Sequence, residues 1–190
     1  MMNAIFQRRR RWGGRRFLAF TLSLTLLTTA SIADNAAAAG KSGLMGDNEV
    51  IKVGQKAPAI ETIDLDGNKF SLESFKGRPL LVDFGSVICE ACGEMVKEIN
   101  RVQKKYAGTD LEFVMIADGA VPVEMTRDFF ARLGATFTLV RDANWSYFEA
   151  YGVTVVPFKV TIDRQGKIRS MHLGYTGDLD KVLDFDGLLK

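Results

Sequence analysis

From about residue 53 onward, short apolar runs alternate with segments in which apolar residues recur at helical spacing. The run from Pro79 to Phe84 is almost continuously apolar, which is typical of a strand buried on both faces of a sheet, and residues 111–117 form a second run of this kind. Between them, residues 90–106 carry apolar side chains three or four positions apart, and Gly108 follows as a stop signal. The pattern predicts a buried strand, a helix and another buried strand.

The remaining segments of this region extend the same alternation. Polar, glycine-containing turns at residues 66–68 and 163–166 each separate two short strand-like runs and predict two β-hairpins. Further helices are predicted at residues 123–133, 144–151 and 179–189, with a short strand at 137–140. The resulting order of hairpin, β, α, β, α, β, α, β, β, α predicts an α/β fold with a central mixed β-sheet flanked by helices and an N-terminal β-hairpin extension.

The first 33 residues have the pattern of an export segment. Six arginines between Arg8 and Arg16 precede an uncharged, largely apolar run from Phe17 to Ala33. We expect either a signal peptide that is cleaved near Ala33 or a retained membrane anchor through residues 17–33, a length at the lower limit for crossing a bilayer. Because the basic flank stays on the cytoplasmic side, both alternatives predict a periplasmic or other extracytoplasmic location for the rest of the chain.

Residues 34–52 are small, polar and aperiodic, so they are predicted to form a flexible linker before a single domain at residues 53–190. The export segment also explains the charge of the chain. It contains six of the 25 basic residues and none of the 23 acidic ones, so its removal changes the formal net charge from +2 to −4. The domain itself is therefore acidic, and its composition gives no basis for nucleic-acid binding.

The only two cysteines of the chain stand in the sequence Cys89-Glu90-Ala91-Cys92, where the first buried strand gives way to a helix. Positions i and i+3 on the first turn of a helix lie on one face, close enough for a disulfide. Cys89 should also face the unsatisfied N–H groups of the helix start, which stabilise a thiolate. We therefore predict a redox-active disulfide in which Cys89 attacks and Cys92 resolves. Glu90 places a negative charge between them, which opposes the Cys89 thiolate and makes the reduced pair the better reductant.

Other interpretations of the cysteine pair need different partners. A zinc site typically takes four ligands, and the only histidine, His172, lies on a predicted strand far along the chain. We therefore expect no metal and no organic cofactor in the reaction. Two soft sulfur ligands would still suit copper, so a copper-binding or chaperone module remains an alternative, as does a static disulfide.

Residues 53–190 resemble the thioredoxin-fold proteins in three segments. Leu81-Val82-Asp83-Phe84 resembles the thioredoxin strand that bears a buried acid six residues before the first cysteine, and Tyr151-Gly152-Val153-Thr154-Val155-Val156-Pro157 resembles the segment with the cis-proline. Gly54-Gln55-Lys56-Ala57-Pro58, together with Ser71-Leu72-Glu73-Ser74-Phe75-Lys76-Gly77, resembles the opening of the exported TlpA/ResA-like thiol-disulfide reductases (redoxins) and of their peroxiredoxin relatives. The resemblance implies a thioredoxin fold.

The same resemblance implies roles for four residues. Asp83 is expected to lie below the disulfide, where burial raises its pKa and lets it exchange a proton with Cys92. A cis peptide bond is expected before Pro157, which leaves neighbouring backbone groups free to pair with an extended substrate. Val156, next to this proline, and Ile88, next to the first cysteine, are then expected to contact the substrate.

The resemblance also implies partners. A monomeric, exported thiol-disulfide oxidoreductase of this kind would reduce disulfides of exported cysteine-containing proteins, with apocytochrome c as one suggested client. Its electrons would come from a membrane-borne dithiol protein. A thiol peroxidase is the alternative, in which Cys89 forms a sulfenic acid that Cys92 condenses with. Against it, no Pro-x-x-x-Thr-x-x-Cys pattern precedes Cys89.

Four positions depart from the usual pattern of these proteins. Ile88 and Gly85 stand where tryptophans are usual, Lys97 replaces a helix proline, and Val156 stands where reducing members often have threonine. A further local similarity links residues 78–86 to the segment that leads to the selenocysteine of iodothyronine deiodinases, with Cys89 at that place. We interpret it as shared ancestry within the fold, because those enzymes generally lack a cysteine at the position of Cys92.

Overall fold

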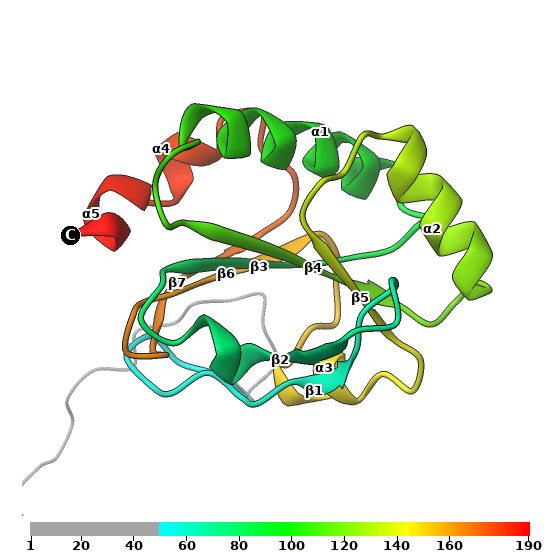
Figure 1. The fold of residues 1–190 in the computed structure, drawn as a ribbon, viewed down its shortest axis with the longest axis horizontal. Coiled ribbons are helices and arrows are strands. Elements are labelled where there is room, and N and C mark those ends of the chain that lie inside the picture. The colour runs from blue at the N-terminus through cyan, green and yellow to red at the C-terminus, as the bar shows by residue number, and fades with distance from the viewer. Residues whose placement is uncertain (1–49) are drawn as a thin grey trace, which may run out of the picture. The chain divides into compact units, whose positions relative to one another are not determined.

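The computed structural model describes residues 50–190, which form a mixed sheet with helices and a small hairpin packed on its two faces (Figure 1). The strands of the sheet are β3 (Leu80–Gly85), β4 (Glu112–Asp118), β5 (Thr138–Asp142), β6 (Phe158–Ile162) and β7 (Ile168–Leu173). Their order across the sheet is β5-β4-β3-β6-β7. The predicted α/β architecture, a central mixed sheet flanked by helices in the arrangement of the thioredoxin fold, is confirmed.

The sheet is parallel on one side of β3 and antiparallel on the other. β4 pairs in parallel with both β3 and β5, whereas β6 pairs antiparallel with β3 and with β7. Every residue of β3 is buried, as expected for the central strand of a sheet covered on both faces, and this explains its apolar run. Because β3, β4 and β5 run in the same direction, the loops that follow them all leave from one edge of the sheet.

Two layers cover the sheet (Figure 1). One face carries α1 (Glu90–Lys105), α2 (Val123–Arg132), α4 (Leu179–Val182) and α5 (Phe185–Leu189), and the other carries the β1–β2 hairpin (Glu61–Ile63 and Lys69–Ser71), the 3-10 helix η1 (Leu72–Phe75) and α3 (Ser146–Ala150). Side chains of β3 alternate between these layers. Leu81 packs in the core beneath α1, whereas Val82 and Phe84 pack in the core on the hairpin side. Asp83 and Gly85 lie two and four residues after Leu81 on the strand, so they lie on the same face of the sheet as Leu81, toward α1.

The C-terminal segment differs from its prediction. The single helix predicted at residues 179–189 is divided into α4 and α5, because Leu183 adopts an extended conformation. The Asp184 side chain then caps α5 by accepting a hydrogen bond from Gly187 N at 2.8 Å. Phe185 is nevertheless buried in the core beneath α1. The apolar residues of the predicted single helix are thus buried by two shorter helices.

The N-terminal boundary of the packed region also differs. Ile51 lies within residues 34–52, which are predicted to form a flexible linker, yet its side chain is buried in the hairpin-side core. Nearby, Gly54 N donates a 2.8 Å hydrogen bond to Ile168 O, which fastens this segment to β7. The export segment predicted at residues 1–33 lies outside the described residues. Within residues 50–190, no helix combines the length and apolar character needed to cross a membrane.

Candidate active site

Cys89 and Cys92 form a disulfide at the edge of the sheet where β3 leads into α1. Cys89 precedes the first helical turn with an extended backbone (φ −101°, ψ 112°), and its sulfur accepts a hydrogen bond from Cys92 N at 3.1 Å. The two Cα atoms lie 5.2 Å apart, within the usual range for a disulfide. A sulfur that caps a helix in this way is placed where the helix dipole stabilises a thiolate.

The two sulfur-bearing residues differ in their access to solvent. Cys92 is only 1% exposed, because α1 carries it over the sheet, whereas Cys89 is half-buried. An incoming thiolate or disulfide can therefore reach Cys89 but not Cys92. This asymmetry is what the predicted roles of attacking and resolving cysteine require.

The loop before β6 lies against the disulfide. The peptide bond between Val156 and Pro157 is cis, and the carbonyl oxygen of Val156 lies 3.9 Å from Cys89 Sγ. Of the two residues predicted to contact a substrate, Ile88 is 76% exposed and Val156 is half-buried. Val155, which precedes Val156 in the same loop, is exposed as well.

Gly85, one of the departures from the thioredoxin pattern, lies beside Cys92 at the end of β3. A Cβ atom on this residue would lie 3.6 Å from Cys92 Cβ and 3.3 Å from the sulfur of Met115 on β4. Met115 is fully buried and occupies the space next to Gly85. The usual tryptophan therefore does not fit at this position unless Met115 is displaced.

Asp83 lies on the α1 side of β3, two residues before Gly85. Its side chain is fully buried, and neither carboxylate oxygen finds a hydrogen-bond partner among the described residues. Burial raises the pKa of Asp83 to about 7, because desolvation penalises the charged form, while the positive charge of Lys159 opposes part of the rise. A carboxyl group in this state can accept and release a proton near neutral pH.

Reasoning from the sequence missed Lys159, which stands opposite Asp83. The two residues pair across the antiparallel ladder of β6 and β3, so their side chains emerge on the same face of the sheet. Lys159 is fully buried, and its ammonium group donates a hydrogen bond to the carbonyl oxygen of Gly174. Burial lowers the pKa of Lys159 to about 8, and the charge of Asp83 opposes that shift. A lone cation inside the apolar run that follows Pro157 was the available signal in the sequence.

Glu90 and His172, the other titratable residues singled out in the sequence, occupy different places. Glu90 is the first residue of α1, and its side chain is exposed. His172 on β7 pairs with Lys159 and so continues the row of polar residues across the sheet. Burial and the charge of Lys159 lower the pKa of His172, so its imidazole is neutral near pH 7. In the part of the chain that the structure describes, no three histidine, cysteine, aspartate or glutamate side chains group as metal ligands.

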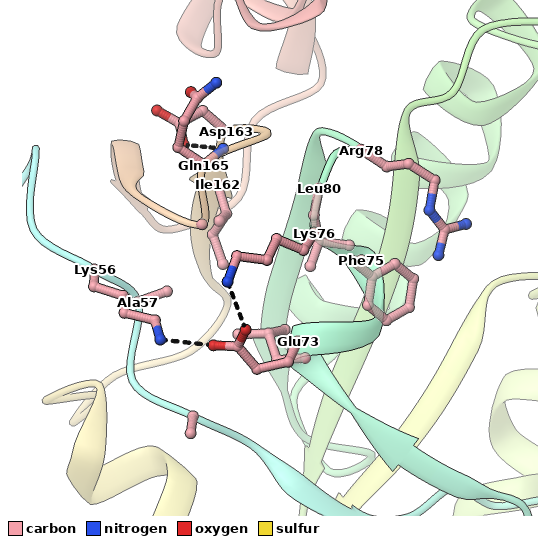
Figure 2. Close-up of a pocket in the computed structure, with 13 residues that line it drawn as sticks. Lys56, Ala57, Glu73, Phe75, Lys76, Arg78, Leu80, Ile162, Asp163 and Gln165 are labelled. Atoms are coloured by element: carbon pink, nitrogen blue, oxygen red, sulfur yellow. Dashed lines mark hydrogen bonds and ion pairs between the residues drawn. The ribbon is translucent and has the colours of Figure 1, made fainter.

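A small cavity lies at the opposite edge of the sheet (Figure 2). It is bounded by Leu80 at the start of β3 and Ile162 at the end of β6, and it encloses about 30 Å³, enough for one water molecule. Figure 2 shows Lys56 and Lys76 pointing at Glu73, with ion pairs of 2.7 Å and 3.4 Å. Because the cavity and the disulfide lie at opposite ends of β3, about 16 Å apart along the strand, the cavity is not part of the candidate active site.

A family model and curated proteins with similar sequences point to one kind of chemistry. The family model described as Redoxin matches residues 52–189. The thiol-disulfide oxidoreductase ResA of Bacillus thuringiensis is 25% identical over a match that covers 70% of this chain and 76% of the relative. The protein of the same description from Geobacillus thermodenitrificans is 26% identical, with coverage of 67% and 73%.

Solved structures give the same indication. A proposed thiol:disulfide interchange protein DsbE from Chlorobium tepidum is 25% identical, with a TM-score of 0.68 and coverage of 74% of this chain and 99% of that one. A proposed thioredoxin from Neisseria meningitidis is 26% identical, with a TM-score of 0.63 and coverage of 70% and 90%. The fold therefore has counterparts in proteins described by thiol-disulfide exchange.

Proposed function

The chain belongs to the Redoxin family and is a thiol-disulfide oxidoreductase, and from this premise we propose that it is exported and reduces disulfide bonds in other exported proteins. The observation that carries the proposal is the unequal access of the two sulfurs. Cys89 is reachable beside an apolar surface, whereas Cys92 is buried beneath it. A pair built in this way exchanges with the cysteines of a partner one sulfur at a time.

The proposed reaction starts from the reduced pair. The Cys89 thiolate attacks a disulfide of the partner, a mixed disulfide forms, and one partner sulfur leaves as a thiolate. Cys92 then gives its proton to Asp83 and attacks Cys89 Sγ, which forms the Cys89–Cys92 bond and releases the second partner sulfur. In total, two electrons and the proton of Cys92 leave the cysteine pair, and the two partner thiolates take up protons from Asp83 and from solvent.

The cis-proline loop is the proposed binding surface for the partner chain. The carbonyl oxygen of Val156 lies 3.9 Å from Cys89 Sγ, so an extended segment can pair with this backbone while its own sulfur meets Cys89. Ile88 and Val155 offer apolar contacts beside it. Recognition through backbone and apolar contacts suits a reductase with more than one client.

The proposed partners follow from the single cysteine pair and from the resemblance to the TlpA/ResA-like group. Each cycle oxidises the pair, and the chain has no further cysteine to restore it, so another dithiol protein must supply electrons. We propose a membrane-borne donor and exported cysteine-containing clients, of which apocytochrome c is the one that the resemblance suggests. The protein acts as a monomer outside the cytoplasm in this proposal, and no metal or organic cofactor enters the reaction.

Trapping of the mixed disulfide tests these roles. In Cys92→Ser the mixed disulfide at Cys89 cannot be resolved, so we expect covalent complexes between the protein and its clients. Dithiothreitol should reduce these complexes, and mass spectrometry of the released proteins identifies the clients. Cys89→Ser is the matched control, because it keeps one cysteine of the motif, and we expect it to capture nothing. Complexes with Cys89→Ser alone would reverse the two roles, and a wild type that reduces no generic disulfide substrate would exclude a reductase.

A further inference from the structure

A lysine and an aspartate are buried together beneath the disulfide. Lys159 and Asp83 are both fully buried and occupy paired positions on β6 and β3. The carboxylate of Asp83 accepts no hydrogen bond from any described residue, and Lys159 donates to the carbonyl oxygen of Gly174 instead. The two charges are thus neighbours without a direct hydrogen bond, and in a poorly hydrated core the ammonium group acts on the carboxylate through its field.

The groups around this pair are apolar or neutral. β4 places Met115 opposite Asp83, and α1 covers the same core with Met95. On the other side of Lys159, β7 places His172, whose pKa is lowered so that it is uncharged near pH 7. Among the described residues, Lys159 is the one charge that shifts the pKa of Asp83.

Asp83 also lies on the strand face that leads to Cys92. Gly85 follows it on the same face of β3, and a Cβ atom on Gly85 would lie 3.6 Å from Cys92 Cβ. Residues i and i+2 of a strand are about 7 Å apart. The path that we infer for a proton between the carboxylate and the thiol therefore runs through water.

We propose that Lys159 is a positioning residue of the exchange reaction: its buried ammonium group favours the ionised form of Asp83, in which the carboxylate can take the proton of Cys92 in the resolving step. This inference rests on the function proposed above. In that step the S–H bond of Cys92 breaks and the proton passes through water to Asp83. The Cys92 thiolate attacks Cys89 Sγ, so the intramolecular disulfide forms while the bond to the partner sulfur breaks. The partner sulfur keeps the electron pair of the broken bond and leaves as a thiolate, and Asp83 returns the proton to this thiolate through water.

A purely structural role for Lys159 predicts something different. Its hydrogen bond to Gly174 O ties β6 to the segment after β7. If Lys159 served only this purpose, its replacement would lower the stability of the protein without changing how the resolving rate depends on pH. The pH profile therefore separates the two roles.

The test follows the mixed disulfide between Cys89 and glutathione from pH 5 to 9. Reduced protein is mixed with oxidised glutathione, quenched with acid at set times and analysed by mass spectrometry, which separates the attack by Cys89 from the resolving step. Lys159→Met keeps an apolar side chain and removes the charge. In this variant we expect the acid limb of the pH profile, where the rate of the resolving step falls with decreasing pH, to move to higher pH. A displacement of one pH unit lowers the rate on that limb about tenfold. Asp83→Asn should lose this limb altogether.

His172→Gln is the matched control, because it removes a neighbour of Lys159 that is already neutral near pH 7. Its profile should coincide with that of the wild type. A wild-type profile in Lys159→Met, accompanied only by a lower melting temperature, would overturn the inference and leave a structural role. A wild type that forms no mixed disulfide at any pH would instead refute the proposed function itself.

Discussion

Asp83 and Lys159 have pKa shifts in opposite directions, and each shift links folding to pH with a definite sign. Asp83 holds its proton more tightly in the folded protein, because burial raises its pKa from 3.8 to about 7. The stability that this provides is complete below about pH 4 and is lost as the pH rises to about 7. Lys159, whose pKa falls from 10.5 to about 8, binds its proton less tightly when folded, so its contribution increases as the pH rises above about 8.

These signs predict the effect of Asp83→Asn on stability. Between pH 5 and pH 7.5 the wild type gradually has to ionise a buried carboxyl group, whereas the variant does not. We expect the free energy of unfolding of Asp83→Asn, relative to the oxidised wild type, to increase by about 2 kcal/mol over this interval. Guanidinium chloride unfolding at both pH values measures the difference. A difference that is independent of pH would show that Asp83 does not titrate in this range.

The sequence predicted most of the residues that make up the candidate site, because they lie at fixed distances from recognisable elements. Cys89 and Cys92 mark the junction of a strand and a helix, Asp83 precedes them on the same strand, and Pro157 opens a later strand. Lys159 could not be identified in this way. Its importance depends on the pairing of β3 with β6, two strands far apart in the sequence, and the register of that pair is a tertiary property.

At the scale of elements, α1 continues from Glu90 to Lys105 although related chains usually have a proline at the position of Lys97. Lys97 is exposed and forms an ion pair with Glu94 at 2.7 Å. A proline here would remove a backbone N–H from the helix interior, and its ring would collide with the preceding turn. α1 is therefore continuous through Lys97 and is not interrupted there as it would be by a proline.

Restoring the proline should weaken this helix. A proline in a helix interior costs about 3 kcal/mol, and we expect Lys97→Pro to lower the free energy of unfolding by an amount close to that. Lys97→Ala is the control, and it should change stability little, because an exposed ion pair contributes little. Denaturant unfolding of the oxidised variants provides the comparison. Equal stabilities of the two variants would mean that α1 accommodates the kink without loss.

The order of the elements followed from the hydrophobic pattern, but a break within one of them did not. Residues 179–189 keep apolar side chains at helical spacing on both sides of Leu183, so periodicity gives no reason to divide them. The division is made by Asp184, whose side chain caps a new helix at Gly187 N. The side-chain cap at Asp184 thus determines where the second helix begins, which the hydrophobic periodicity does not show.

At the scale of the whole described region, the N-terminal hairpin covers the sheet face opposite α1 (Figure 1). Ile60 and Phe70 are buried in the same core as Phe84 and Tyr151. This packing removes apolar surface of the central strands from water on the face that α1 leaves uncovered. The sequence predicted the hairpin but not its docking site, because that site depends on which face of the sheet the helices occupy.

Two tyrosines at α3 fasten this extension to the rest of the protein. Tyr151 donates its hydroxyl hydrogen to Pro58 O at 2.8 Å, and Tyr147 donates to Glu61 O at 2.6 Å. Tyr151 is almost fully buried, so Tyr151→Phe leaves the Pro58 carbonyl poorly satisfied, and we expect the free energy of unfolding to fall by about 1 kcal/mol. Tyr147→Phe is the matched control at an exposed bond and should lose less, because water can replace the hydroxyl group. In Tyr151→Phe, amide hydrogen exchange should become faster in β1 and β2 than in β3 if the hairpin opens independently of the sheet. An equal increase of the exchange rate in all of these strands would show that the hairpin and the sheet unfold as one unit.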